Sequence, residues 1–197
     1  MFTRILVLVY LIISTSIAEA AMPPPLSVEY SADRSIETDS GTIQGSIMAA
    51  PGMERGEMRM GAIASVMIVR MDARKGWMLM PAQKMYQELD FTQAAQQSGS
   101  VDPERVELEV AGTETVSGLA TTKYKFVAKD RKSGGFLWYS ADGIPVKMDV
   151  LSKEGGRNSR MTVTLQNIRV GAQDRSAFEV PAGYNRLPGG GLFGMKR

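Results

Sequence analysis

The stretch Val146-Lys147-Met148-Asp149-Val150 decides the fold of this chain, because apolar and charged residues alternate along it. A period of two puts the apolar side chains on one face of a β-strand and the charged ones on the other. Asp142-Gly143, just before it, is a strong turn signal. Val106–Val110 and Met161–Gln166 repeat the alternation. These segments predict antiparallel strands with one polar and one apolar face.

The first half of the chain continues this rhythm less regularly. Alternation marks strands in Leu26–Ser31, Thr42–Met48 and Met53–Met60, and Ile63–Met71 is apolar on both faces, as in a central strand. Phe91–Gln97, rich in Ala and Gln, is the one convincing helical stretch. We therefore expect a mainly β protein with about ten strands and one or two short helices.

The apolar face of such a sheet has to be covered, yet the chain offers little helix to cover it. Either the sheet curls around its own side chains, or it leaves a groove that another molecule fills. This choice is the main route from the sequence to a function.

The beginning of the chain has the pattern of a secretory signal peptide. Arg4 precedes the apolar run Ile5–Ile13, and Ala18-Glu19-Ala20 is an A-x-A cleavage site. We expect residues 1–20 to be removed after Ala20, 21–25 to be a proline-rich extended leader, 26–187 to form one β domain, and 188–197 to be a flexible, glycine-rich basic tail. The apolar run is shorter than the roughly 20 residues of a membrane-spanning helix, so the predicted location is the periplasm.

Composition excludes several classes of chemistry. The chain has no His and no Cys, which removes Ser-His-Asp and Cys-His nucleophiles and the usual zinc ligand sets. Its net charge is +2 with the charges dispersed, which argues against nucleic acid as a partner. We predict a protein that is not an enzyme and has no catalytic residues, metal site or cofactor.

Methionine is the unusual feature of the composition. The chain has 14, and nine lie between Met48 and Met85, including the M-x-M pairs Met58/Met60 and Met78/Met80. Three interpretations stay open: ordinary core packing, an adaptable apolar surface for a flexible ligand, or thioether ligands for Cu(I).

Several phrases in the second half resemble a bacterial periplasmic family of unknown function. They are Gly118–Phe126, Trp138–Met148, Asn167–Gly171 and Asp174–Tyr184, which ends in F-E-V-P-A-G-Y. That family is similar in fold to the lipoprotein carrier LolA and its receptor LolB. The resemblance implies a single, strongly curved antiparallel sheet, an unclosed half-barrel whose concave side holds apolar chains.

The leading hypothesis is a binding module that shields an acyl chain of a lipid or lipoprotein in the concave face. The candidate lining residues are Met58, Met60, Met67, Met78, Met80, Phe136 and Trp138. The alternatives are a structural or interaction protein with a self-filled core and an envelope protein as partner, and a Met-based Cu(I)-handling protein.

Overall fold

The computed structural model describes residues 22–187, except 62, 93, 95–103 and 155. The predicted signal peptide and C-terminal tail lie outside these residues, as does most of the predicted helix at Phe91–Gln97. Of that helix, Phe91, Thr92 and Ala94 are described, and all three are helical. No helix in the described part of the chain is long and apolar enough to span a bilayer.

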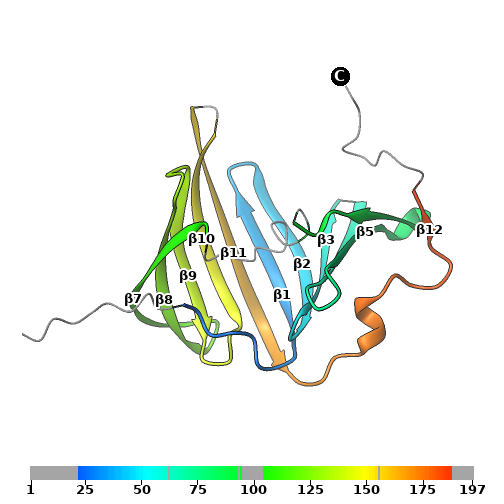
Figure 1. Cartoon of the computed structure of the whole chain (residues 1–197), viewed down its shortest axis with the longest axis horizontal. Helices are drawn as coiled ribbons and strands as arrows, with labels where there is room; N and C mark the ends of the chain where they lie inside the picture. Colours follow the sequence, from blue (N-terminus) through cyan, green and yellow to red (C-terminus); the bar gives the residue numbers. More distant parts are fainter. Residues whose placement is uncertain (1–21, 62, 93, 95–103, 155, 188–197) are drawn as a thin grey trace, which may run out of the picture.

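Twelve strands form one sheet in the order β12-β6-β5-β4-β3-β2-β1-β11-β10-β9-β8-β7 (Figure 1). Every pairing is antiparallel except that of β12 with β6. The strands are β1 Tyr30–Thr38, β2 Gly41–Ala50, β3 Met53–Met60, β4 Ile63–Arg70, β5 Lys75–Met80, β6 Met85–Leu89, β7 Val106–Val116, β8 Leu119–Ala128, β9 Ser133–Ser140, β10 Pro145–Glu154, β11 Arg157–Val170 and β12 Asn185–Arg186. Two short 3-10 helices, η1 Pro81–Gln83 and η2 Arg175–Phe178, complete the described elements.

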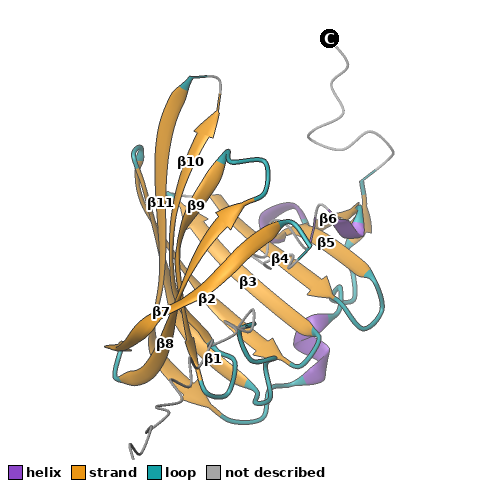
Figure 2. Cartoon of the chain, turned by 60° about the vertical axis from the view of Figure 1, so that its left-hand side comes forward, coloured by secondary structure: helices purple, strands orange, loops and turns teal. Residues whose placement is uncertain are grey.

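The sheet is strongly curved and does not close on itself (Figure 2), since β12 and β7 lie at its two edges. Tyr139 of β9 and Val69 of β4 line one pocket although five strands separate them in the sheet. Residues so far apart in the sheet can share a pocket only on its concave side. The prediction of a mainly β, unclosed half-barrel with short helices is therefore confirmed, as is the architecture that the resemblance to LolA implied.

The convex face of β3–β6 is covered by the chain's own C-terminal segment. Phe178 of η2 is fully buried there, in a cluster with Ile68, Trp77 and Leu79. Phe178 lies at the end of a 3-10 helix and not in a strand. The Asp174 carboxylate accepts a hydrogen bond from the Ser176 backbone N–H at 2.9 Å, which starts a helical turn instead.

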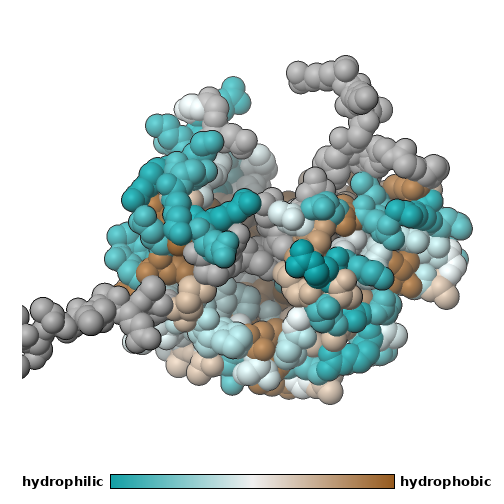
Figure 3. All heavy atoms as spheres, in the orientation of Figure 1, coloured by the Kyte–Doolittle hydropathy of each residue, from teal (hydrophilic) through white to brown (hydrophobic). Residues whose placement is uncertain are grey.

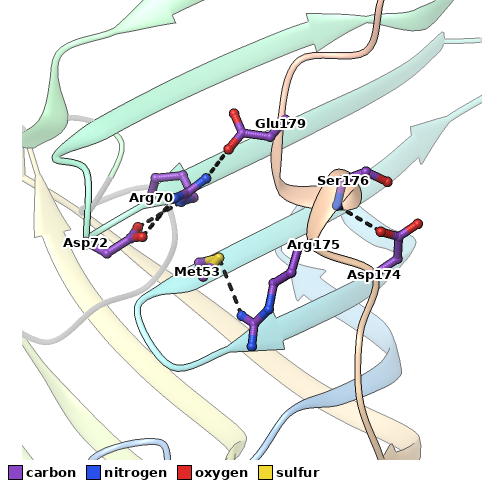
Figure 4. Close-up of polar contacts among 7 residues, drawn as sticks. All are labelled: Met53, Arg70, Asp72, Asp174, Arg175, Ser176 and Glu179. Carbon is purple, nitrogen blue, oxygen red and sulfur yellow. Dashed lines mark hydrogen bonds and ion pairs between the residues drawn. The ribbon is translucent and has the colours of Figure 1, made fainter.

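An ion pair and hydrogen bonds attach this segment to the sheet (Figure 4). Arg70 of β4 donates to both Asp72 oxygens at 2.8 Å and also contacts Glu179. Arg55 of β3 donates to the backbone carbonyl of Ala177 at 3.1 Å. Residues of the C-terminal segment therefore cover the convex face of β3–β6.

Candidate ligand site on the concave face

An unbroken row of apolar side chains crosses the concave face. In antiparallel sheets, directly paired residues share a face, and successive pairings join seven neighbouring strands from β2 to β7. We call these residues the apolar row: Ile43, Ile36, Val163, Met148, Leu137, Tyr124 and Val110. Only Leu137 and Tyr124 are fully buried, and Val110 is 52% exposed. The row therefore keeps part of its apolar surface exposed. Figure 3 shows hydrophobic residues interspersed with hydrophilic ones over the visible surface of the molecule.

A pocket of about 290 Å³ lies on the same face, near the turns that join β2 to β3 and β9 to β10. The N-terminal segment forms one of its walls, held by a hydrogen bond from the Ser27 N–H to the Asp142 carbonyl at 3.0 Å. The lining residues are Pro24, Leu26, Tyr30, Ala49, Ala50, Gly52, Met53, Glu54, Val69, Met71, Tyr139, Gly143 and Pro145. Glu54 is the only carboxylate among them.

Glu54 pairs with Arg34 inside this apolar surrounding. Arg34 Nη1 lies 3.6 Å from Glu54 Oε1, which is ion-pair distance but too long for a good hydrogen bond. Arg34 is 7% exposed, and about a quarter (24%) of the Glu54 side chain remains accessible. Within the described part of the chain, Arg34 Nε and Glu54 Oε1 are buried and have no hydrogen-bond partner. A buried donor and a buried acceptor left unsatisfied side by side need an explanation.

Burial controls the protonation of this site. It raises the pKa of the Glu54 carboxyl to about 7, and the charge of Arg34 offsets only part of the rise. Burial also raises the pKa of Tyr139 to about 12 and that of Tyr30 still further above its usual value, with the charge of Glu54 adding to both shifts. Glu54 is thus the group near this pocket that changes charge around neutral pH.

Gly56 leaves room for the side chain of Arg34. Gly56 of β3 lies on the same face as Glu54, and a Cβ there would stand 2.3 Å from Arg34 Nη2. The guanidinium therefore occupies the space that a side chain at position 56 would fill. This lets Arg34 extend from β1 across β2 to β3 along the floor of the sheet.

The structure brings five of the seven predicted lining residues onto the concave face. The pairings of Met58 with Gly45 and Ser65, and of Met67 with Met78, put Met58, Met60, Met67, Met78 and Met80 on the face that carries Glu54. Met67 is buried and packs with Ala94, whereas Met60 is 64% exposed.

Phe136 and Trp138 are not brought together with the methionines. Both alternate with Leu137 of the apolar row, so they lie on the convex face. Trp138 is covered there by Lys123 and Lys147, each 4.8 Å from a ring centroid, and its indole N–H donates to Glu114 at 2.8 Å. These contacts account for its burial without any ligand.

Sequence reasoning missed Arg34 and Glu54. A signal was present, since Arg34 follows Tyr30 and Ala32 and precedes Ile36 at positions that all face inward. A charge at an inward position of an apolar alternation is rare unless it is paired or functional. Glu54 had no comparable signal, because its neighbours Met53 and Arg55 do not show which face is apolar.

The concave face combines apolar surface with one pair of opposite charges. Leaving out the undescribed positions, no three His, Cys, Asp or Glu side chains lie close enough together to hold a metal ion. What the concave face presents is a long apolar surface and, near one end, one acid and one base of opposite charge.

The comparisons with known proteins give a family and a fold. The family described as "Domain of unknown function (DUF4412)" matches residues 35–142. That range includes Arg34's neighbour Ser35 and all of β3, but not the C-terminal phrase F-E-V-P-A-G-Y, which the sequence resemblance had emphasised. No curated protein matches the chain.

Among solved structures, an uncharacterized conserved protein from Thermus thermophilus is similar in fold, with a TM-score of 0.56 at 12% identity. The match covers 82% of this chain and 91% of that one. The Pseudomonas aeruginosa MucA/MucB complex matches with a TM-score of 0.49 at 14% identity, covering 78% of this chain and 56% of that one. A putative outer membrane lipoprotein-sorting protein domain from Vibrio parahaemolyticus matches with a TM-score of 0.35 at 8% identity, covering 76% of this chain and 89% of that one.

Proposed function

We propose that this chain, which belongs to the DUF4412 family of unknown function, is a non-enzymatic periplasmic binding module that shields an acyl chain in the concave face of its sheet. The acyl chain would come from a lipid or a lipoprotein. The signal-peptide pattern at residues 1–20 supports export to the periplasm.

The observation that carries this proposal is the apolar row. A protein of this size can bury most of its apolar side chains, yet Ile36, Ile43, Met148 and Val163 are only partly buried in the middle of the sheet. On the convex face, by contrast, the C-terminal segment covers the apolar cluster around Phe178. An exposed apolar surface that is concave and continuous is typical of a ligand site.

The dimensions of the concave face also suit an acyl chain. Six residues of β1 separate Tyr30, beside the pocket, from Ile36 in the apolar row, which is roughly 20 Å at about 3.3 Å per residue. One leaflet of a bilayer has a hydrocarbon thickness of about 15 Å, half of a core of about 30 Å. A single acyl chain therefore fits between the pocket and the row.

The first test is native mass spectrometry of the mature protein, purified gently from its own envelope. We expect extra mass that matches an acyl-containing species and disappears on delipidation. The delipidated protein should then take up dodecanol, whose head group is neutral. A clean mass together with no uptake of dodecanol would contradict the proposal and favour an interaction module with a protein partner.

A matched pair of variants tests the location. Ile43 and Gln44 are neighbours on β2 that face opposite sides of the sheet. Ile43→Lys puts a charge into the apolar row and should weaken dodecanol binding by about tenfold or more. Gln44→Lys adds the same charge to the convex face and should leave binding unchanged. If the two substitutions weakened dodecanol binding equally, the ligand would not bind on the concave face.

A further inference from the structure

We propose that Arg34 and Glu54 recognise the free carboxylate of a fatty acid, whose tail lies along the apolar row. This inference rests on the proposed function and narrows the acyl ligand to one with an unesterified carboxyl head. It assigns a role to the buried pair that packing does not explain.

The first argument is the pair's incomplete bonding. Among the described residues, Arg34 Nε is a buried donor without a partner, and the 3.6 Å contact between Arg34 Nη1 and Glu54 Oε1 leaves the carboxyl oxygen without a hydrogen bond. Oε1 itself is shielded from solvent, so the accessible quarter of the Glu54 side chain belongs to its other atoms, which face the pocket. A ligand in the pocket therefore meets Glu54 directly. Arg34 does not line the pocket, but its Nη1 lies 3.6 Å from Glu54 Oε1.

The second argument is charge. An amine head would meet Arg34 as a like charge in an apolar surrounding, which is unfavourable. A carboxylate head is attracted to Arg34, provided that Glu54 gives up its own negative charge. The remaining titratable groups that face Glu54, Tyr30 and Tyr139, are neutral hydroxyls at physiological pH.

These charges determine how many protons the protein takes up when a carboxylate binds. Where Glu54 is ionised, one proton is taken from solution for each carboxylate bound, and the protonated Glu54 donates its O–H to a carboxylate oxygen of the ligand. Arg34 keeps its positive charge and balances the single negative charge that the two carboxyl groups share. Because burial already raises the pKa of Glu54 to about 7, this proton is taken up at little cost near neutral pH.

The pocket volume fits a head group with a few methylenes. About 290 Å³ corresponds to roughly ten water molecules at about 30 Å³ each. The head can occupy this space while the rest of the chain reaches the apolar row.

The test compares four twelve-carbon probes by isothermal titration calorimetry on the delipidated full-length mature protein: dodecanoate, dodecanol, dodecylamine and dodecyl phosphate. We expect dodecanoate to bind at least about tenfold more tightly than the other three at pH 6.5. Its affinity should fall by about tenfold per pH unit above pH 7, because Glu54 must be protonated first. Titrations in buffers of different ionisation enthalpy should show uptake of about one proton at pH 8.

A double variant separates recognition of the head from binding of the tail. Arg34→Met with Glu54→Leu removes both charges together, so no buried charge is left alone. It should bind dodecanoate no more tightly than dodecanol and should take up no proton when dodecanoate binds.

Three results would overturn the inference while leaving the proposed function intact: equal binding of dodecanol and dodecanoate, equal binding of dodecyl phosphate and dodecanoate, or dodecanoate binding with no proton uptake at pH 8. The first or third result would mean that the head group of the ligand does not engage the buried pair, and the second that the pair attracts anions in general. Failure of all four probes to bind would overturn both proposals.

Discussion

The acidic residues on the two faces of the sheet around β3 and β4 have pKa values that are shifted in opposite directions. On the convex side, hydrogen bonds from Arg70 hold the pKa of Asp72 below its usual value, and Arg70 is itself tied to Glu179 of the C-terminal segment. On the concave side, burial raises the pKa of Glu54, and Arg34 lies too far away for a hydrogen bond. The convex charges are hydrogen-bonded and stabilise the fold. The concave pair is kept poorly bonded in an apolar surrounding, which is typical of functional sites.

The apolar residues of the two faces differ in the same sense. Phe178 fills the convex cluster completely, with no exposed surface. The concave face has no comparable plug within the described residues over Ile36, Ile43 or Met148, which stay half-buried. Stability should therefore depend on convex contacts, and ligand binding on concave ones.

The largest effect on stability is expected for Phe178→Ala. Removing a fully buried phenyl ring leaves a cavity between η2 and the sheet, and such truncations cost about 3–5 kcal/mol of unfolding free energy. Urea unfolding measures it. The control on the concave face is Met60→Ala, at a side chain that is 64% exposed, with an expected change within about 0.5 kcal/mol. If both variants lost a similar amount of unfolding free energy, stability would not depend on the convex contacts more than on the concave ones.

The second effect concerns the buried pair. Glu54→Leu leaves the Arg34 guanidinium buried without a counter-charge and, since arginine does not lose its proton in proteins, should cost about 3 kcal/mol. The double variant Arg34→Met with Glu54→Leu should recover most of this loss, because matched apolar replacements of buried pairs are close to neutral. Thermal unfolding of both variants would show it. A double variant as unstable as the single one would mean that the pair is mainly a stabilising element.

The third effect is a pH dependence that runs against the usual direction for an acid. The pKa of Glu54 is raised in the folded state, from 4.5 to about 7, so the folded protein binds an extra proton between these values. Stability from this group is full below about pH 4.5 and is lost as the pH rises through 7, by about 2 kcal/mol between pH 5 and 8. Because the chain has no histidine, no other side chain ordinarily titrates in that window.

The acids of the convex face give the opposite slope at lower pH. The pKa values of Asp72 and Asp149 are lowered by Arg70 and Arg160, so their contribution is present above their unfolded values and is lost on acidification. Urea unfolding from pH 3 to 8 should therefore show a maximum near pH 5. The double variant should stay flat between pH 5 and 8, and a wild type that is flat there would show that Glu54 titrates normally.

The sequence predicted the class of fold because alternation is a local signal. Val146–Val150 and Met161–Gln166 became β10 and β11 with the expected faces. The position of Phe136 and Trp138 could not be predicted in the same way. Alternation shows which residues share a face within one strand, but only the register between strands shows whether the faces of distant strands agree. Trp138 is also apolar enough to look like core, while two lysines cover it on the convex side.

The candidate site was harder to predict than the fold, because it is made by contacts between strands. Arg34 and Glu54 are 20 residues apart, and their proximity depends on the β1–β2 and β2–β3 pairings and on the bare backbone of Gly56. The M-x-M spacing places Met58 with Met60, and Met78 with Met80, on one face of their own strand, whereas the pairings of β3 with β4 and of β4 with β5 put these methionines on the same face of the sheet. The ion pair of Arg34 and Glu54 had no local pattern in the sequence beyond the one inward-facing arginine.

The smallest effect is expected for Gly56→Ala, which tests how far the position of Arg34 depends on this glycine. A Cβ at this position would lie 2.3 Å from Arg34 Nη2, so the flexible end of Arg34 must shift while β3 stays in place. We expect a stability loss of about 1 kcal/mol or less, because only a side-chain terminus moves. A longer distance between Arg34 and Glu54 weakens the one interaction that lowers the pKa of Glu54, so that pKa should rise further and the falling limb of the stability profile should move to higher pH. Gly118→Ala is the matched control, since nothing lies within 4 Å of its Cβ, and its positive φ of 81° confines the cost to local backbone strain in the β7–β8 turn. An unshifted limb in Gly56→Ala would mean that Arg34 contributes little to the electrostatics of Glu54, and that desolvation alone makes the concave site differ from the convex one.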